Sequence, residues 1–196
     1  MKGVPIKFFK ILIKTLLLLV LVAILIGLTL PQNYSVNKNI QINANVATVK
    51  SLVSDFSLWH TWSPWGKVDP SITFTLGEPS RGIGAHQSWQ SDWGYGEMTI
   101  TSLSQNKMTF NALLKNEHII EGEITFTEVE GVVNVTCNIN GQTNTPLISG
   151  YLSIFSEYVL SNTVSLGLNN LQTVAQLRDQ KTQLDNDDSK ISPSEN

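Results

Sequence analysis

The residues best suited to ligand-binding chemistry are the tryptophans, which gather in one short part of the chain. All five lie between residues 59 and 93. An indole ring buries a large apolar area and carries one N–H donor, so such a cluster can hold an apolar ligand or fill a core. The spacing of Trp59 and Trp62 favours core packing of a helix on a sheet. Trp65 and Trp89 fit a pocket wall or the core equally well, and Trp93 is expected in a turn.

The ionisable side chains form no catalytic pattern. His60, His86 and His118 are too scattered to predict a metal site. Cys137 lies on the apolar side of an alternating run and is expected to be an inert core thiol, while Glu97 is expected on a wet face. Nucleophile-elbow, phosphate-loop and dinucleotide signatures are absent. We therefore predict no catalytic residue, no metal and no cofactor.

Apolar residues recur at every second position over much of residues 72–141, which is typical of half-buried strands. Six such runs are separated by short turn signals rich in Gly and Asn. They predict an antiparallel sheet with one wet face and one dry face. The alternation places Met98, Phe110 and Phe126 on the dry face. We therefore predict a ligand pocket lined by Trp65, Trp89, Met98, Phe110 and Phe126.

Further elements must flank this sheet. A strand is predicted over residues 34–42, and Asn45 is the predicted N-cap of a short amphipathic helix. Residues 146–177 carry a broad apolar stripe and predict a long helix that covers the dry face. Gly167 within this helix indicates a close approach of its backbone to the sheet. The predicted fold is α+β, with one long helix lying across a curved antiparallel sheet.

Several motifs resemble those of START-like SRPBCC proteins of the polyketide cyclase/dehydrase type. The segments Asp55-Phe56-Ser57-Leu58-Trp59 and Trp62-Ser63-Pro64-Trp65 resemble the family's D-F-x-x-W-x-x-W-x-P-W pattern. Residues 82–100 resemble its next two strands. Gly167-Leu168-Asn169-Asn170-Leu171 resembles the G-L-x-x-L end of its long helix. The resemblance covers residues 36–177, and the helix start Asn45-Val46-Ala47 departs from the family's Pro-Pro-Glu.

The resemblance implies a helix-grip fold, in which about seven antiparallel strands wrap a long C-terminal helix around a hydrophobic cavity. Members of this superfamily bind lipids, sterols, polyketides or other apolar ligands, and a minority catalyse reactions on them. The superfamily has no invariant catalytic set, so the resemblance transfers no catalytic residue to this chain.

A long apolar segment precedes the domain. Residues 11–30 include one charge, Lys14, and are otherwise dominated by Leu, Ile and Val. At about 1.5 Å per residue they form a helix about 30 Å long, which is the thickness of the hydrocarbon core of a bilayer. Three lysines precede the segment and only Lys38 follows it closely. The positive-inside rule then predicts a cytoplasmic N-terminus and an extracytoplasmic domain on an inner (plasma) membrane.

A cleaved signal peptide is the competing interpretation of this segment. It would need a shorter apolar run and a small-x-small cleavage site, whereas Gly27-Leu28-Thr29-Leu30-Pro31 is a poor site. We therefore favour an uncleaved signal-anchor. The predicted layout is a basic cytoplasmic flank (1–10), a transmembrane anchor (11–30), a linker (31–35), a START-like domain (36–178) and a disordered acidic tail (179–196).

The charge of the domain limits the classes of molecule that it can bind, and its cysteine content limits its disulfides. Four of the 13 Lys and Arg precede residue 31, so nine stand against 16 Asp and Glu in the exported part, a net charge of −7. Nucleic acid is excluded as a partner because the domain has no basic patch. Anionic lipid headgroups would repel it, so the anchor must hold it at the membrane. A single cysteine allows no intramolecular disulfide.

These observations predict a membrane-tethered module that binds a lipid or another small apolar molecule between the sheet and the C-terminal helix. Two alternatives stay open. An enzyme of the cyclase, dehydratase or hydrolase type would need a polar acid/base group inside the cavity. A ligand-free module that docks an envelope protein would need a filled cavity and a large exposed apolar patch.

Overall fold

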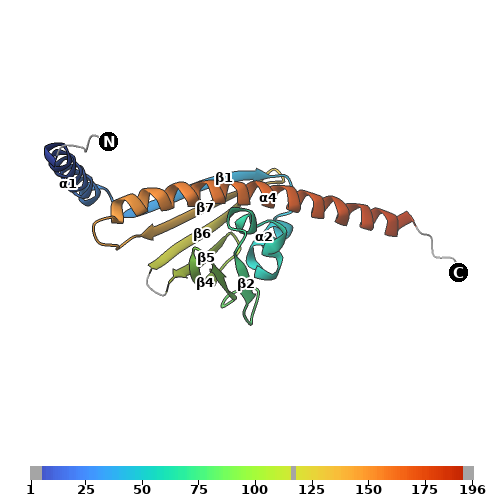
Figure 1. Cartoon of the computed structure of the whole chain (residues 1–196). Coiled ribbons are helices and arrows are strands. Elements are labelled where there is room, and N and C mark those ends of the chain that lie inside the picture. Colours follow the sequence, from blue (N-terminus) through green and yellow to red (C-terminus); the bar gives the residue numbers. More distant parts are fainter. Residues whose placement is uncertain (1–5, 116–117, 192–196) are drawn as a thin grey trace, which may run out of the picture.

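A seven-stranded antiparallel sheet is the centre of the computed structural model, which describes residues 6–115 and 118–191 (Figure 1). Its order is β1-β7-β6-β5-β4-β3-β2, so the first strand pairs with the last and the others follow as a meander. The strands are β1 (Asn33–Ile42), β2 (Thr73–Leu76), β3 (His86–Ser91), β4 (Gly94–Leu103), β5 (Lys107–Leu114), β6 (His118–Val129) and β7 (Val132–Gln142). The predicted α+β helix-grip fold is confirmed.

Helices precede, interrupt and follow the sheet. They are α1 (Ile6–Thr29), α2 (Val46–Ser54), the 3-10 helix η1 (Phe56–Thr61), the short α3 (Trp65–Val68) and the long α4 (Ser149–Ile191). The sheet curves around α2 and the middle of α4, while α1 lies beyond the sheet, at the end where α4 begins (Figure 1).

Helix α2 closes one end of the concave face. The Asn45 side chain accepts a hydrogen bond from the Ala47 N–H at 2.8 Å, which confirms the predicted N-cap. Val49, Leu52 and Val53 recur at helical spacing and are fully buried against the sheet. Because three large side chains leave water together, this short helix is held by burial more than by its own length.

Helix α4 is longer than the sequence predicts. A disordered tail was expected from residue 179, but the helix continues to Ile191, and residues 192–196 lie outside the described chain. The Asp179 carboxylate accepts hydrogen bonds from the Asn45 N–H and the Thr48 hydroxyl, both at 3.1 Å. It thereby places a negative charge at the N-terminus of α2. Neither Gly nor Pro interrupts residues 179–191, so the helix propagates beyond this attachment.

Gly167 corrects another expectation. Its backbone approaches the segment between η1 and α3 and not the sheet, because a Cβ at this position would lie 3.2 Å from Pro64 Cδ. The aromatic segment, residues 59–65, therefore packs against α4. This contact forms one wall of the site described below.

Candidate functional site: an apolar cavity beneath α4

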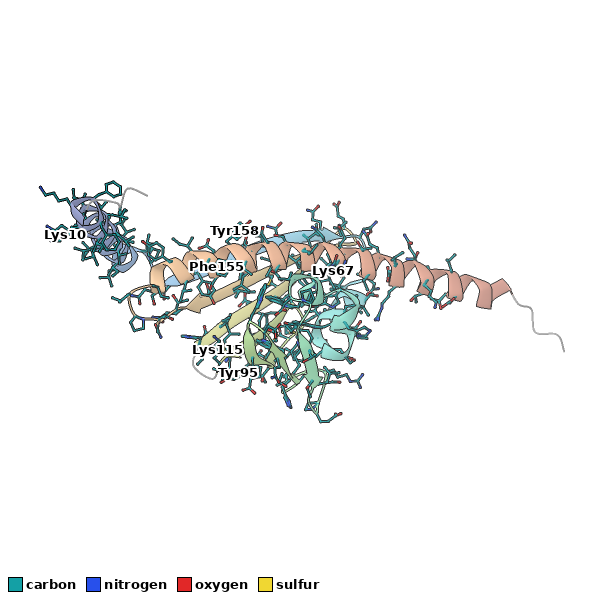
Figure 2. The ribbon with its side chains drawn as sticks, in the orientation of Figure 1. Lys10, Lys67, Tyr95, Lys115, Phe155 and Tyr158 are labelled. Carbon is teal, nitrogen blue, oxygen red and sulfur yellow. The ribbon has the colours of Figure 1, made fainter. Side chains whose placement is uncertain are left out.

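A cavity of about 360 Å³ lies between the concave face of the sheet and α4. Apolar side chains make up most of its wall. They come from all seven strands, from residues 59–65 and from α4, and include Tyr34, Trp65, Phe74, Trp89, Met98, Phe110, Ala112, Ile120, Ile124, Val135, Val159, Leu168 and Leu171. Figure 2 shows side chains gathered between α4 and the strands. The interior is therefore not filled by the protein itself.

Three aromatic rings lie flat across glycines of neighbouring strands and form the floor of this cavity. A Cβ at Gly122 would overlap the Phe110 ring, and one at Gly141 would overlap Tyr34. A Cβ at Gly96 would lie 2.5 Å from the Trp89 ring. Each glycine lets a ring rest on the backbone instead of standing up into the concave face, which is what keeps the space open.

The side-chain amide of Gln87 interrupts the mostly apolar floor. Strand register aligns Gln87, Met98, Ala112, Ile120 and Gly141 in a single row, with Tyr34 paired to Gly141 at its far end. Gln87 is 4% exposed and lines the cavity. No group within residues 6–115 and 118–191 makes a hydrogen bond to its side-chain amide. The amide is not among the fully buried atoms that lack a partner, so it faces the open space of the cavity, where a ligand can hydrogen-bond to it.

The end of the cavity near α2 is closed by Trp59 and Trp62. Their indole N–H groups donate to the carbonyls of Val53 and Leu52 at 2.9 and 3.0 Å. The two rings lie 5.0 Å apart, and Phe56 meets Trp59 edge-on at 4.9 Å. Because both polar groups are satisfied and both rings are buried, this end is a packed plug.

The opposite end is the mouth. The wall residues there are exposed and come from the β3–β4 turn, the end of β5 and the first half of α4: Trp93, Tyr95, Lys115 and Phe155. The Lys115 N–H donates to the Tyr95 carbonyl at 3.1 Å, which ties the two strand ends together. In Figure 2 the labelled Tyr95, Lys115 and Phe155 lie in the half of the domain nearer α1, and Lys67 lies farther away.

Asp69 is the carboxylate in the cavity wall. It is buried, and its Oδ1 accepts hydrogen bonds from the Ser71 N–H at 3.0 Å and the Ser71 hydroxyl at 2.6 Å. The hydrogen bond from the Ser71 side chain is the main reason that the pKa of Asp69 lies below its ordinary value. The group is therefore ionised at neutral pH, and it holds the turn into β2.

No family model matches this chain, and no curated protein does. Solved structures do match. A START superfamily protein from Mycobacterium smegmatis superposes with a TM-score of 0.51 at 13% identity, over 74% of this chain and 98% of that one. Major latex-like protein 151 of Panax ginseng gives 0.51 at 12%, over 74% and 99%. The di-domain ARO/CYC StfQ from the steffimycin biosynthetic pathway gives 0.57 at 10%, over 75% and 52%.

This chain has the START-like helix-grip fold. The resemblance stated for residues 36–177 is thus confirmed at the level of the fold, by architecture rather than by sequence identity.

Four of the five predicted pocket residues lie in the wall of the START-like cavity: Trp65, Trp89, Met98 and Phe110. Phe126 does not. Alternation correctly places it on the concave face with Ile120 and Ile124, but it lies farther along β6, pairs with Val135 and is buried in the core. Alternation along a strand predicts which face a residue lies on but not its position along the cavity, which is why it could not distinguish Phe126 from the wall residues.

The wall also holds residues that the prediction omitted. Gln87 shares the dry-face parity of Trp89, and a polar residue at such a position was the available signal. Tyr34 belongs to the first strand, so only the pairing of β1 with β7 brings it to the cavity. Asp69 follows the aromatic segment in a loop, where no periodicity marks it.

The remaining ionisable residues lie away from this wall or are inert in it. Glu97 is exposed on the convex face, as expected. Burial raises the pKa of the Cys137 thiol to about 12, so it remains protonated at neutral pH and is a poor nucleophile. Among the described residues, no group of three or more His, Cys, Asp or Glu is arranged to hold a metal ion.

Proposed function

We propose that this chain is a membrane-tethered binding module that holds a small hydrophobic molecule, such as a lipid, in the cavity beneath α4. The observation that carries the proposal is the unfilled apolar space between the sheet and α4. Protein interiors are otherwise closely packed, and a void of this size sacrifices dispersion and hydrophobic energy that a ligand would restore. The glycine-supported aromatic floor maintains this space.

Gln87 narrows the chemistry of the ligand. An uncharged amide in a mostly apolar wall favours a molecule with an apolar body and a neutral hydrogen-bonding group, such as a hydroxyl or a carbonyl. A neutral hydrogen bond of this kind adds about 0.5–1.5 kcal/mol, which is up to about tenfold in affinity.

The tether is α1. In the described chain one helix, Lys7–Thr29, is long and apolar enough to cross a membrane. The lysines at its N-terminal end, Lys7, Lys10 and Lys14, favour a cytoplasmic N-terminus and an extracytoplasmic domain. Protease treatment of sealed inverted and right-side-out membrane vesicles tests this orientation: the domain should be digested only where the extracytoplasmic face is outside.

An enzyme acting on a similar molecule is the alternative, and Asp69 is the group that could favour it. However, the lowered pKa of Asp69 makes it a weak base at neutral pH, and its Oδ1 already accepts two hydrogen bonds. Binding without chemistry therefore accounts better for the wall.

Photo-crosslinking of the full chain in phosphatidylcholine vesicles tests the binding proposal. Two medium-chain alkyl diazirines are compared, one with a terminal hydroxyl and one without. We expect adducts on Met98, Phe110 and Leu171, with the hydroxyl probe favoured by up to about tenfold. Gln87→Leu should abolish that preference while the hydrocarbon probe still binds.

Gln90→Leu is the matched control, since Gln90 lies on the same strand but is exposed. It should leave the preference unchanged. Adducts confined to α1 and the outer surface would overturn the binding function. Adducts in the cavity with equal labelling by both probes would retain the function and overturn the role of Gln87.

A further inference from the structure

The end of α1 is packed against the beginning of α4. The Tyr151 hydroxyl donates to the Ala23 carbonyl at 2.7 Å. Gly27 and Gly150 allow close contact, because a Cβ at Gly27 would lie 2.6 Å from the Tyr151 ring and one at Gly150 would lie 2.7 Å from the Gly27 carbonyl oxygen. If α1 spans the bilayer, these contacts place the first turns of α4 at its surface.

An exposed apolar stripe continues along α4 from this junction. It consists of Tyr151, Ile154, Phe155 and Tyr158, which lie at helical spacing on one face of α4, and it is preceded by the exposed Leu147 and Ile148 in the turn before the helix. Phe155 and Tyr158 are 63% and 68% exposed, which is unusual for large apolar residues on a soluble surface. Tyrosines among aliphatic side chains are typical of the interface between water and a bilayer.

The mouth of the cavity lies at the same end of the sheet. Asn33 begins β1 after the short connection from α1 and pairs with Gln142, so this end of the sheet is tied to α1. The strand pairing places Leu114 of β5 and Gly96 of β4 at this same end of the sheet. Tyr95 and Lys115 of the mouth adjoin those residues, and Phe155 belongs both to the stripe and to the cavity wall. The stripe therefore runs from the anchor to the mouth.

We propose that the α4 stripe lies in the headgroup region of the same bilayer that holds α1, so that the mouth opens onto the lipid and the ligand enters from the membrane without crossing water. This inference rests on the membrane tether of the proposed function. The bilayer is the occupant that fits, because the stripe is continuous with the α1 contact. The Lys115 ammonium at the mouth can meet lipid phosphates.

Depth-dependent quenching in the full chain tests this placement. Ile154→Cys and Tyr158→Cys are each labelled with an environment-sensitive nitrobenzoxadiazole dye in phosphatidylcholine vesicles, with and without doxyl-labelled phosphatidylcholine. Both positions are on the stripe and outside the main cavity wall. The native Cys137 is buried and does not compete for the label. We expect both labels to be quenched about as strongly as one at Thr29→Cys, near the end of α1.

Val129→Cys is the matched control, because Val129 is an equally exposed apolar residue at the far end of the sheet. Its label should not be quenched. Labels at 154 and 158 that respond like the one at 129 would overturn the inference. This outcome is distinct from a failure of ligand binding, because the dye reports the position of α4 whether or not the cavity is occupied.

Discussion

The two ends of the cavity use the same residue type in opposite ways. At the α2 end, Trp59 and Trp62 are buried, and backbone carbonyls accept both indole N–H groups. At the mouth, Trp93 is 64% exposed, and its indole N–H has no partner in the part of the chain that the structure describes. The tryptophans that close the α2 end thus have hydrogen-bonded indole N–H groups. The indole N–H of Trp93 at the mouth is accessible, and the proposed ligand would enter there.

Removing one ring of the plug is the strongest test of this contrast. Trp59→Ala should lower the free energy of unfolding by about 3–5 kcal/mol, because it leaves a cavity and an unpaired Val53 carbonyl. Thermal unfolding of the full chain in detergent, followed by near-ultraviolet circular dichroism, measures the effect. A loss below about 1 kcal/mol would mean that the closed end is as adaptable as the mouth.

Gly122→Ala tests the floor of the cavity between the two ends. The added methyl would overlap the Phe110 ring and force it upward into the cavity. We expect a loss of about 1–3 kcal/mol in stability together with weaker cavity labelling by the alkyl diazirine probes. Gly66→Ala is the matched control, since nothing lies within 4 Å of the added Cβ. It should leave the labelling unchanged and should not lower the free energy of unfolding, because Ala is favoured over Gly in a helix. Undiminished labelling in Gly122→Ala would show that the floor does not set the volume.

Asp69 allows a further test, because its carboxylate is hydrogen-bonded although it lies near the mouth. Its pKa in the folded chain lies below its ordinary value, mainly through the Ser71 hydroxyl. Its contribution to stability is therefore present at neutral pH and is lost as the pH falls through the lowered folded pKa. The unfolding midpoint of the parent chain should fall on acidification in that range, and the Asp69→Asn chain should lack this part of the dependence. Identical pH profiles would assign the acid sensitivity to other carboxylates.

Trp93→Ala should have the smallest effect on the fold. Its ring is largely in water, so the free energy of unfolding should change by no more than about 0.5 kcal/mol. Cavity labelling by the same probes should nevertheless decrease, because the ring forms part of the rim. A loss of stability comparable to that of Trp59→Ala would remove the distinction between plug and mouth.

The sequence predicted the fold better than the site, for a physical reason. Period-two alternation determines which face of a strand is dry, and this sufficed for the sheet, its covering helix and the placement of Met98 and Phe110. Depth along a strand depends on register and on what closes each end, so Phe126 was assigned to the wrong region. The polar composition of residues 179–196 predicts disorder, because few apolar side chains there offset the entropy cost of ordering. Composition does not reveal a single tertiary contact such as the hydrogen bonds from Asn45 and Thr48 to Asp179, and the extension of α4 was therefore not predicted.

The connection between α1 and β1 limits how far the domain can travel. Only residues 30–32 separate the two elements. At about 3.3–3.6 Å per residue, this linker spans about 10 Å when fully extended. If α1 is the membrane anchor proposed above, a linker of this length keeps the domain at the surface of that membrane. The proposed ligand would then be passed on only to an acceptor at the same membrane, and exchange with a distant compartment would require a separate, diffusible carrier.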